Sequence, residues 1–253
     1  MVAAPRPPAR LWRGLVRGVL LAASLWPGLA NALEITAARY SGATQIYDHL
    51  VLGKPHNWST LDVTLSDGRV TSVILSERVF EDIAPRLADM DGDGNPEILT
   101  VEAKPGQGAR VAFYGLGPDG QLGLRAATPY IGTNNRWLAP VGVADFDGDG
   151  AVEFAYVDRP HLAKTLRVWR WNSAPDGDVR LQELAIVGGL TNHRIGEDWI
   201  TGGVRDCGDG PEMVLARGNW AGMVAVRFIG GFRLRELGAD TSRIAFDRAL
   251  RCD

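Results

Sequence analysis

The chain contains two nearly identical stretches, DMDGDGNPE at residues 89–97 and DFDGDGAVE at residues 145–153. We call them loop 1 and loop 2. Each has carboxylates at positions 1, 3, 5 and 9 and glycines at positions 4 and 6. Alternating acidic residues turn several oxygens to one side, and glycine allows the positive φ of a tight turn around a cation. The pattern predicts two sites for a hard divalent cation.

Apolar residues flank both loops. Ile98 and Leu99 follow loop 1, and Val143 and Phe154 stand on either side of loop 2. Short apolar runs around a tight turn favour a strand–loop–strand arrangement. A damaged third copy, DCGDGPE at residues 206–212, is about two residues shorter. Its acidic residues cannot fill positions 1, 5 and 9 together, so we expect no ion there, or a weakly bound one.

Alternating strands meet at Asp-Gly turns in the regions between the acidic loops. Such hairpin signals occur at residues 66–68, 118–120 and 175–177, and residues 223–234 form a weaker fourth copy. Residues 35–50 have a strand–turn–strand outline around Gly42 without any acid in the turn. Four strands in about 55 residues, repeated about four times, predict an all-β fold. We expect a β-propeller of about four four-stranded blades, either small or incomplete.

The first 32 residues are expected to be a secretory signal peptide. Four arginines precede an apolar run at residues 19–30, and Ala30 and Ala32 fit a small-x-small cleavage signature. The run is short of the roughly 20 residues of a spanning helix, and an uncleaved anchor is the alternative. Residues 33–253 would then form one exported domain, periplasmic or extracellular and without a membrane span, with units at roughly 33–82, 83–137, 138–198 and 199–253.

The expected mature chain is acidic. Removing four arginines and no acid changes the formal net charge from −3 to about −7. A negative surface repels phosphate backbones, so nucleic acid is excluded as a partner. Calcium, which is abundant outside the cytoplasm, suits such a protein.

Two cysteines, Cys207 and Cys252, fall in the mature chain. An even count in an oxidising compartment favours one disulfide, and two unpaired buried thiols are the alternative. Because Cys207 lies inside the third loop, we hypothesise that the disulfide replaces a metal as the staple of that loop.

Residues 88–99 and 144–154 resemble the FG-GAP (VCBS-type, integrin-like) repeat family. In that family the D-x-D-G-D-G-x-x-D/E loop joins the first two strands of a propeller blade and binds Ca²⁺. Its propellers commonly have six or seven blades, more than this chain supports. An EF-hand is excluded because it needs a glutamate at position 12, where Thr100 and Tyr156 stand. The resemblance implies two Ca²⁺ sites: the side chains of Asp89, Asp91, Asp93 and Glu97 with the Asn95 carbonyl, and those of Asp145, Asp147, Asp149 and Glu153 with the Ala151 carbonyl.

The sequence contains no G-x-S-x-G, H-E-x-x-H or Gly-rich phosphate motif. We therefore predict a non-enzymatic, calcium-binding scaffold for a protein or glycan partner. A carbohydrate-active hydrolase or lyase is the first alternative, and a structural protein of the cell envelope is the second. The enzyme would be favoured if polar residues of two linkers converged in one deep pocket: Asn135, Arg136, His193, Arg194 and Glu197.

Overall fold

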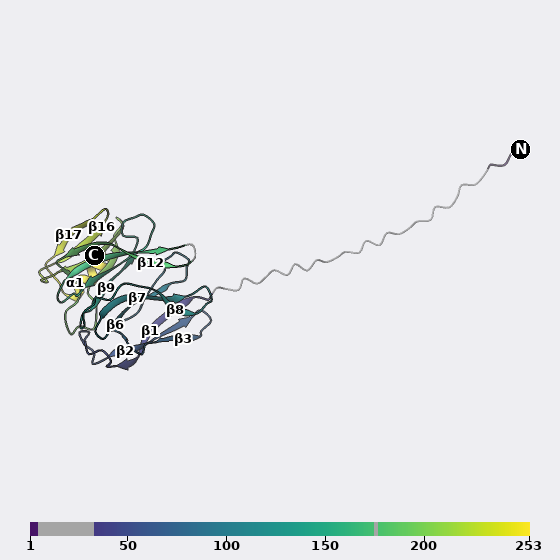
Figure 1. Cartoon of the computed structure of the whole chain (residues 1–253). Coiled ribbons are helices and arrows are strands. Elements are labelled where there is room, and N and C mark those ends of the chain that lie inside the picture. Colours follow the sequence, from purple (N-terminus) through teal and green to yellow (C-terminus); the bar gives the residue numbers. More distant parts are fainter. Residues whose placement is uncertain (5–32, 175–176) are drawn as a thin grey trace. The chain divides into compact units, whose positions relative to one another are not determined.

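Antiparallel strands are the main secondary structure of the computed structural model, which describes residues 1–4, 33–174 and 177–253. The predicted signal peptide lies outside this part of the chain except for its first four residues. Leu33–Asp253 forms one compact unit. Its strands run in chain order from β1 to β17, and one helix, α1, follows them (Figure 1).

The clearest repeat is a four-stranded meander that contains loop 2. Its spatial order is β12-β11-β10-β9. Strand β10 is buried along its whole length, whereas β12 is half-buried or exposed throughout. This gradient explains why β10 reads as a continuous apolar run, because both of its faces are covered. The strands are β9 (Leu138–Ala144), β10 (Glu153–Asp158), β11 (Thr165–Ser173) and β12 (Val179–Gly188).

The last meander in the chain contains the short third loop. Strands β14 to β17 pair in sequence, and the two-residue strand β13 adds to the same edge of β15 ahead of β14. Residues 192–202 separate β13 from β14, so the first strand of this meander is split. The strands are β13 (Leu190–Thr191), β14 (Gly203–Asp206), β15 (Pro211–Arg217), β16 (Met223–Phe228) and β17 (Phe232–Gly238).

The N-terminal half forms one eight-stranded sheet. Strands β5 to β8 form another meander, the first in chain order, which contains loop 1. Strand β4 joins them to β1, β2 and β3, because Phe80 pairs with Trp58 of β2 while Val79 and Phe80 pair with β6. The strands are β1 (Ile35–Thr44), β2 (Asn57–Leu65), β3 (Val70–Ile74), β4 (Val79–Phe80), β5 (Arg86–Ala88), β6 (Glu97–Lys104), β7 (Gly108–Leu116) and β8 (Leu122–Ala127).

The all-β prediction is confirmed, but four separate four-stranded blades are not. Three meanders have the topology of a blade, whereas the first unit, β1 to β4, is fused to the second because its strand β4 pairs with β6. Among residues 33–174 and 177–253 no sheet closes on itself. The turn expected around Gly42 was wrong, because β1 continues through it and pairs with β2 along nearly its whole length.

All four predicted hairpins are present. They join β2 to β3, β7 to β8, β11 to β12, and β16 to β17. The Asp-Gly turns were reliable signals because the conformation that they favour is set locally, by two or three residues.

One hydrophobic core is shared by the three meanders. Val101 of β6 and Leu215 of β15 are fully buried members of it. Phe113 of β7 makes edge-on ring contacts with Phe154 and Trp171 of the next meander, at centroid distances of 4.8 and 5.2 Å. The acidic loops therefore lead into strands β6 and β10, which are buried along nearly their whole length.

The C-terminal helix and the disulfide complete the meander that contains the third loop, β14 to β17. Helix α1 (Arg243–Leu250), which the sequence did not predict, is capped by Ser242, whose hydroxyl accepts a hydrogen bond from the Ala245 N–H. Its residue Phe246 is buried against β15 and β16. The predicted disulfide between Cys207 and Cys252 is confirmed, with a Cα–Cα distance of 5.7 Å. It ties the third loop to the chain just after α1.

Replacing Cys207 and Cys252 together by alanine is expected to lower the free energy of unfolding by about 2–4 kcal/mol, because the bond closes a long loop in the unfolded chain. Urea unfolding monitored by circular dichroism measures this. Dithiothreitol should destabilise the wild type by a similar amount and leave the double variant unchanged. Equal stability of the wild type with and without reductant would contradict the prediction.

Candidate functional site

Loops 1 and 2 occupy the same place in two successive meanders. Loop 1 joins β5 to β6, and loop 2 joins β9 to β10. The backbone turns at positions 4 and 6 of each loop have φ between 78 and 89° (Gly92, Gly94, Gly148 and Gly150). Only glycine adopts this conformation without strain, which explains the two glycines of the motif.

The first aspartate of each loop organises the turn. Both carboxylate oxygens of Asp89 accept backbone N–H groups, from Gly92 at 2.7 Å and from Gly94 at 3.0 Å. Asp145 accepts the equivalent N–H groups of loop 2, at 2.7 and 2.9 Å. Short polar side chains commonly hold turns in this way. The loop geometry is therefore fixed by the chain itself.

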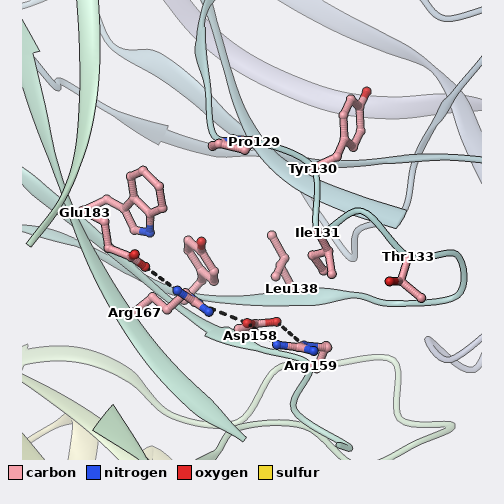
Figure 2. A pocket seen from close by; sticks show the side chains of 11 residues that line it. Pro129, Tyr130, Ile131, Thr133, Leu138, Asp158, Arg159, Arg167 and Glu183 are labelled. Atoms are coloured by element: carbon pink, nitrogen blue, oxygen red, sulfur yellow. Dashed lines mark hydrogen bonds and ion pairs between the residues drawn. The ribbon is translucent and has the colours of Figure 1, made fainter. Parts of the chain in front are cut away.

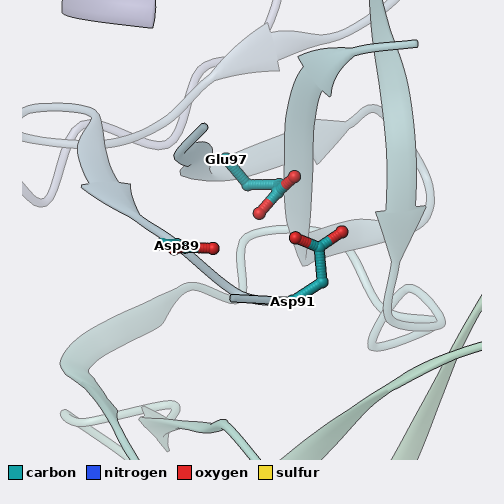
Figure 3. A group of neighbouring side chains, drawn as sticks. All are labelled: Asp89, Asp91 and Glu97. Carbon is teal, nitrogen blue, oxygen red and sulfur yellow. The ribbon is translucent and has the colours of Figure 1, made fainter. Parts of the chain in front are cut away.

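In loop 1 three carboxylates face one another. One oxygen each of Asp89, Asp91 and Glu97 lies within 4.8 Å of the other two (Figure 3). Glu97 is 5% exposed. Burial and the negative charges of Asp91 and Asp93 raise the pKa of Glu97 to about 7. This crowding of acids opposes ionisation unless a positive charge is close.

Loop 2 repeats this arrangement. Oxygens of Asp145, Asp147 and Glu153 lie within 4.8 Å of one another. Glu153 is fully buried, and burial raises its pKa although a hydrogen bond from Arg170 opposes the shift. The Asp147 Oδ1 atom is buried and has no hydrogen-bond partner in the described part of the chain. An orphaned carboxylate oxygen within an all-oxygen donor set fits a hard cation such as Ca²⁺.

Two of the predicted carboxylate ligands, Asp93 and Asp149, lie outside these groups of three. Asp93 instead accepts the Asn95 N–H at 2.7 Å, and Asp149 accepts the Ala151 N–H at 2.9 Å. The Asn95 side chain accepts the Ile35 N–H at 3.1 Å. The two carboxylates and the two predicted carbonyl ligands, those of Asn95 and Ala151, therefore remain predictions.

The third loop has a different chemistry. Asp206 accepts the N–H groups of Gly208 and Gly210, as the first aspartates of loops 1 and 2 do. Glu212, however, is held by the guanidinium groups of Arg205 and Arg235. Within the described ranges, 33–174 and 177–253, only loops 1 and 2 gather three metal-ligating side chains.

With the loop geometry established, comparison with protein families is informative. Residues 89–156 match the family model described as an FG-GAP-like repeat. This segment is similar to an FG-GAP-like repeat. It begins at the first aspartate of loop 1 and ends within β10, just after loop 2, so the predicted resemblance is confirmed for this part of the chain. No curated protein shows a significant match to the chain.

A cavity of about 320 Å³ lies between the linker after β8, the start of β9 and strands β10 to β12 (Figure 2). One side carries a continuous row of paired charges: Glu183 with Arg167, Arg167 with Asp158, and Asp158 with Arg159. Two carboxylates and two guanidinium groups leave this row without net charge. We call this cavity the aromatic pocket because Tyr130, Tyr156 and Trp169 also line it.

The indole N–H of Trp169 is buried and has no hydrogen-bond partner among the described residues. Sequence reasoning missed this pocket. Its polar residues come from a linker and three strands, and the only local signal is the charged pair Asp158-Arg159 directly after the apolar run of β10.

A smaller cavity of about 160 Å³, the histidine pocket, contains two of the five linker residues that we singled out. Asn135 and Arg136 line it together with His49 and His161. The other three lie elsewhere: His193 is buried behind His161, and the Arg194 guanidinium lies 3.5 Å from the Trp220 ring centroid and pairs with Glu197. The five residues therefore do not converge in one deep pocket.

The hydrogen bonds of His193 define its tautomer. Its Nε2 atom lies 3.0 Å from the Glu197 carbonyl oxygen, which can only accept, so Nε2 carries the proton. When His193 is neutral, its Nδ1 accepts from the His161 Nε2–H, at 2.8 Å. Burial and the neighbouring His193, His49 and Lys164 lower the pKa of His161 to about 4. Both imidazoles are therefore neutral at pH 7.

We expect His161 to make the fold sensitive to acid. Its pKa is lower in the folded chain than the ordinary 6.5, so its contribution to stability is complete above pH 6.5 and is lost as the pH falls towards 4. The melting temperature of the wild type minus that of H161N should therefore shrink over this interval. Scanning calorimetry at several pH values measures it. A difference that is constant or grows in acid would contradict the prediction.

Proposed function

We propose that this chain is an exported, calcium-stabilised, β-propeller-like module that binds a protein or glycan partner and catalyses no reaction. One observation carries the calcium part of the proposal. Two loops at equivalent points of successive meanders each bring three carboxylates within 4.8 Å. The FG-GAP-like repeat that spans both loops supports the same reading.

Calcium would act as a structural staple between the first and second strands of the two meanders that contain loops 1 and 2. Ca²⁺ takes six to eight oxygen ligands, and when bound it supplies the positive charge that crowded carboxylates lack. The chain prepares the site through the N–H groups that fix Asp89 and Asp145. The residues that would hold the ion are Asp89, Asp91 and Glu97 in loop 1 and Asp145, Asp147 and Glu153 in loop 2.

The aromatic pocket supports a glycan as the partner. Its charged row is internally neutralised, which favours an uncharged ligand with many hydroxyl groups over an ion. The Trp169 N–H and the neighbouring Tyr156 hydroxyl offer polar groups to a sugar, and aromatic rings provide the apolar faces on which sugar rings pack. A volume of about 320 Å³ is within the usual range for small-ligand sites.

The non-enzymatic reading is supported by how the linker residues are distributed. Arg194 and Glu197 pair with each other and do not line the histidine pocket, which contains Asn135 and Arg136. A hydrolase or lyase would need an acid and a base facing one pocket. The carboxylates of the aromatic pocket, Asp158 and Glu183, are both engaged by Arg167.

Export is supported by the disulfide, because such bonds persist in oxidising compartments. No helix within the described residues is long and apolar enough to cross a membrane. We place the mature chain in the periplasm or outside the cell.

Removing calcium with EDTA is expected to lower the melting temperature by about 5–10 °C relative to saturating Ca²⁺, because an ion that binds only the folded state stabilises it by mass action. Differential scanning fluorimetry measures the shift, and added Ca²⁺ should reverse it. An unchanged melting curve across the titration would disprove the stabilising role.

The test variant for this experiment is D91A, which removes a ligand of loop 1. The matched control is D119A, which changes an acidic residue of the β7–β8 turn. D91A should respond less to Ca²⁺ than the wild type, whereas D119A should respond fully. Equal responses of the two variants would show that the stabilising ion binds elsewhere.

A neutral trisaccharide is expected to bind the aromatic pocket and to change tryptophan fluorescence. Maltotriose, cellotriose and chitotriose are suitable probes, with trigalacturonic acid as the charged comparison. W169F should weaken binding of the active sugar about tenfold, because it removes one hydrogen-bond donor and part of the ring. W199F, which changes a tryptophan outside the pocket, should leave it intact. Equal weakening by both variants, or binding of the acidic sugar alone, would contradict the prediction.

A further inference from the structure

We propose that Arg170 makes the two calcium loops unequal: loop 1 is the high-affinity site, and loop 2 binds Ca²⁺ only in competition with this guanidinium. The inference rests on the proposed calcium function and assigns Arg170 as the residue that sets the affinity of loop 2.

Arg170 lies on β11 directly opposite Glu153, the last residue of loop 2. Its guanidinium forms ion pairs with Asp147, Asp149 and Glu153 at N–O distances of 2.7, 2.8 and 2.7 Å. Its side chain is 18% exposed, and that of Glu153 is fully buried. A cation and Arg170 therefore compete for the same oxygens, because two of these three acids belong to the group that would hold the ion.

Loop 1 has a glycine at the matching position. Tyr114 pairs with Ile98, which places Gly115 beside Glu97, and a Cβ atom on Gly115 would lie 3.4 Å from the Glu97 Cγ. Glycine sends no side chain into the loop. Arg125 of β8 lies close to Gly115, and its charge acts on Asp91, but it forms no direct ion pair with a loop 1 carboxylate among the described residues.

The difference in charge follows directly. Loop 1 carries four carboxylates without a paired cation, whereas loop 2 carries four carboxylates and one guanidinium. To bind Ca²⁺ with all its acids, loop 2 must release three charge-assisted contacts, which are the stronger kind of hydrogen bond. Asp147 Oδ1 stays unpartnered even with Arg170 in place, so loop 2 keeps one free ligand atom. We infer weakened binding there rather than none.

The third loop extends this series. Its last glutamate, Glu212, pairs with Arg205 across β14 and β15 and also with Arg235 of β17. Two arginines and a disulfide thus hold a loop that lacks the full acidic pattern. In the three loops, in chain order, the last glutamate meets no arginine, one arginine and two arginines.

Isothermal titration calorimetry with CaCl₂ on the decalcified full chain tests the proposal. D147N leaves loop 1 as the intact site, and D91N leaves loop 2. We expect D147N to bind Ca²⁺ at least about tenfold more tightly than D91N. Adding R170Q to D91N should tighten loop 2 by about tenfold, which corresponds to about 1.4 kcal/mol. Adding R170K, which keeps the charge, should tighten it much less.

The control is R217Q in the D91N background. Among the described residues, Arg217 forms an ion pair only with Glu236, in the meander of the third loop, and its loss changes the net charge equally. Loop 2 affinity should not change. Circular dichroism melting shows whether each variant folds. If no variant and no wild type binds Ca²⁺, the proposed calcium function fails. If D91N and D147N bind equally and R170Q changes nothing, calcium binding stands and the inequality of the loops is refuted.

Discussion

Negative charge gathered in the turns between first and second strands is the constraint on which the rest of the structure depends. Each of loops 1 and 2 places four carboxylates within nine residues, and the last of them, Glu97 or Glu153, is buried at the start of a central strand. Backbone N–H groups satisfy the first aspartate. They cannot neutralise the others, so a cation or a basic side chain has to complete the turn.

The three loops differ in how this charge is balanced. Among the described residues, the carboxylates of loop 1 form no ion pair, those of loop 2 pair with Arg170, and the third loop has Arg205, Arg235 and a disulfide. On the proposed reading, dependence on calcium decreases along the chain. The meander of the third loop, β14 to β17, with its helix and disulfide, would hold its shape without metal. The sheet that carries loop 1 would respond most to calcium.

Strand β10 separates the two kinds of chemistry in the middle meander. Loop 2 ends at Glu153, where β10 starts, while Asp158 and Arg159 follow at the far end, where both pockets lie. Six residues of extended chain span about 20 Å. Because β10 is buried and rigid, a fixed loop 2 at one end of the strand can position the pocket residues at the other end, although loop 2 itself does not line either pocket.

The sequence by itself determined the all-β class, the hairpins, the two acidic loops and the cysteine pair, because glycine-rich turns and alternating strands are specified by neighbours a few residues apart. Tertiary structure decided the rest. Strand β4 fused the first unit to the second, α1 formed against β15, and the aromatic pocket assembled from separate strands. The role inferred for Arg170 also depends on register, since it lies 17 residues from Glu153 and only the pairing of β10 with β11 brings them together.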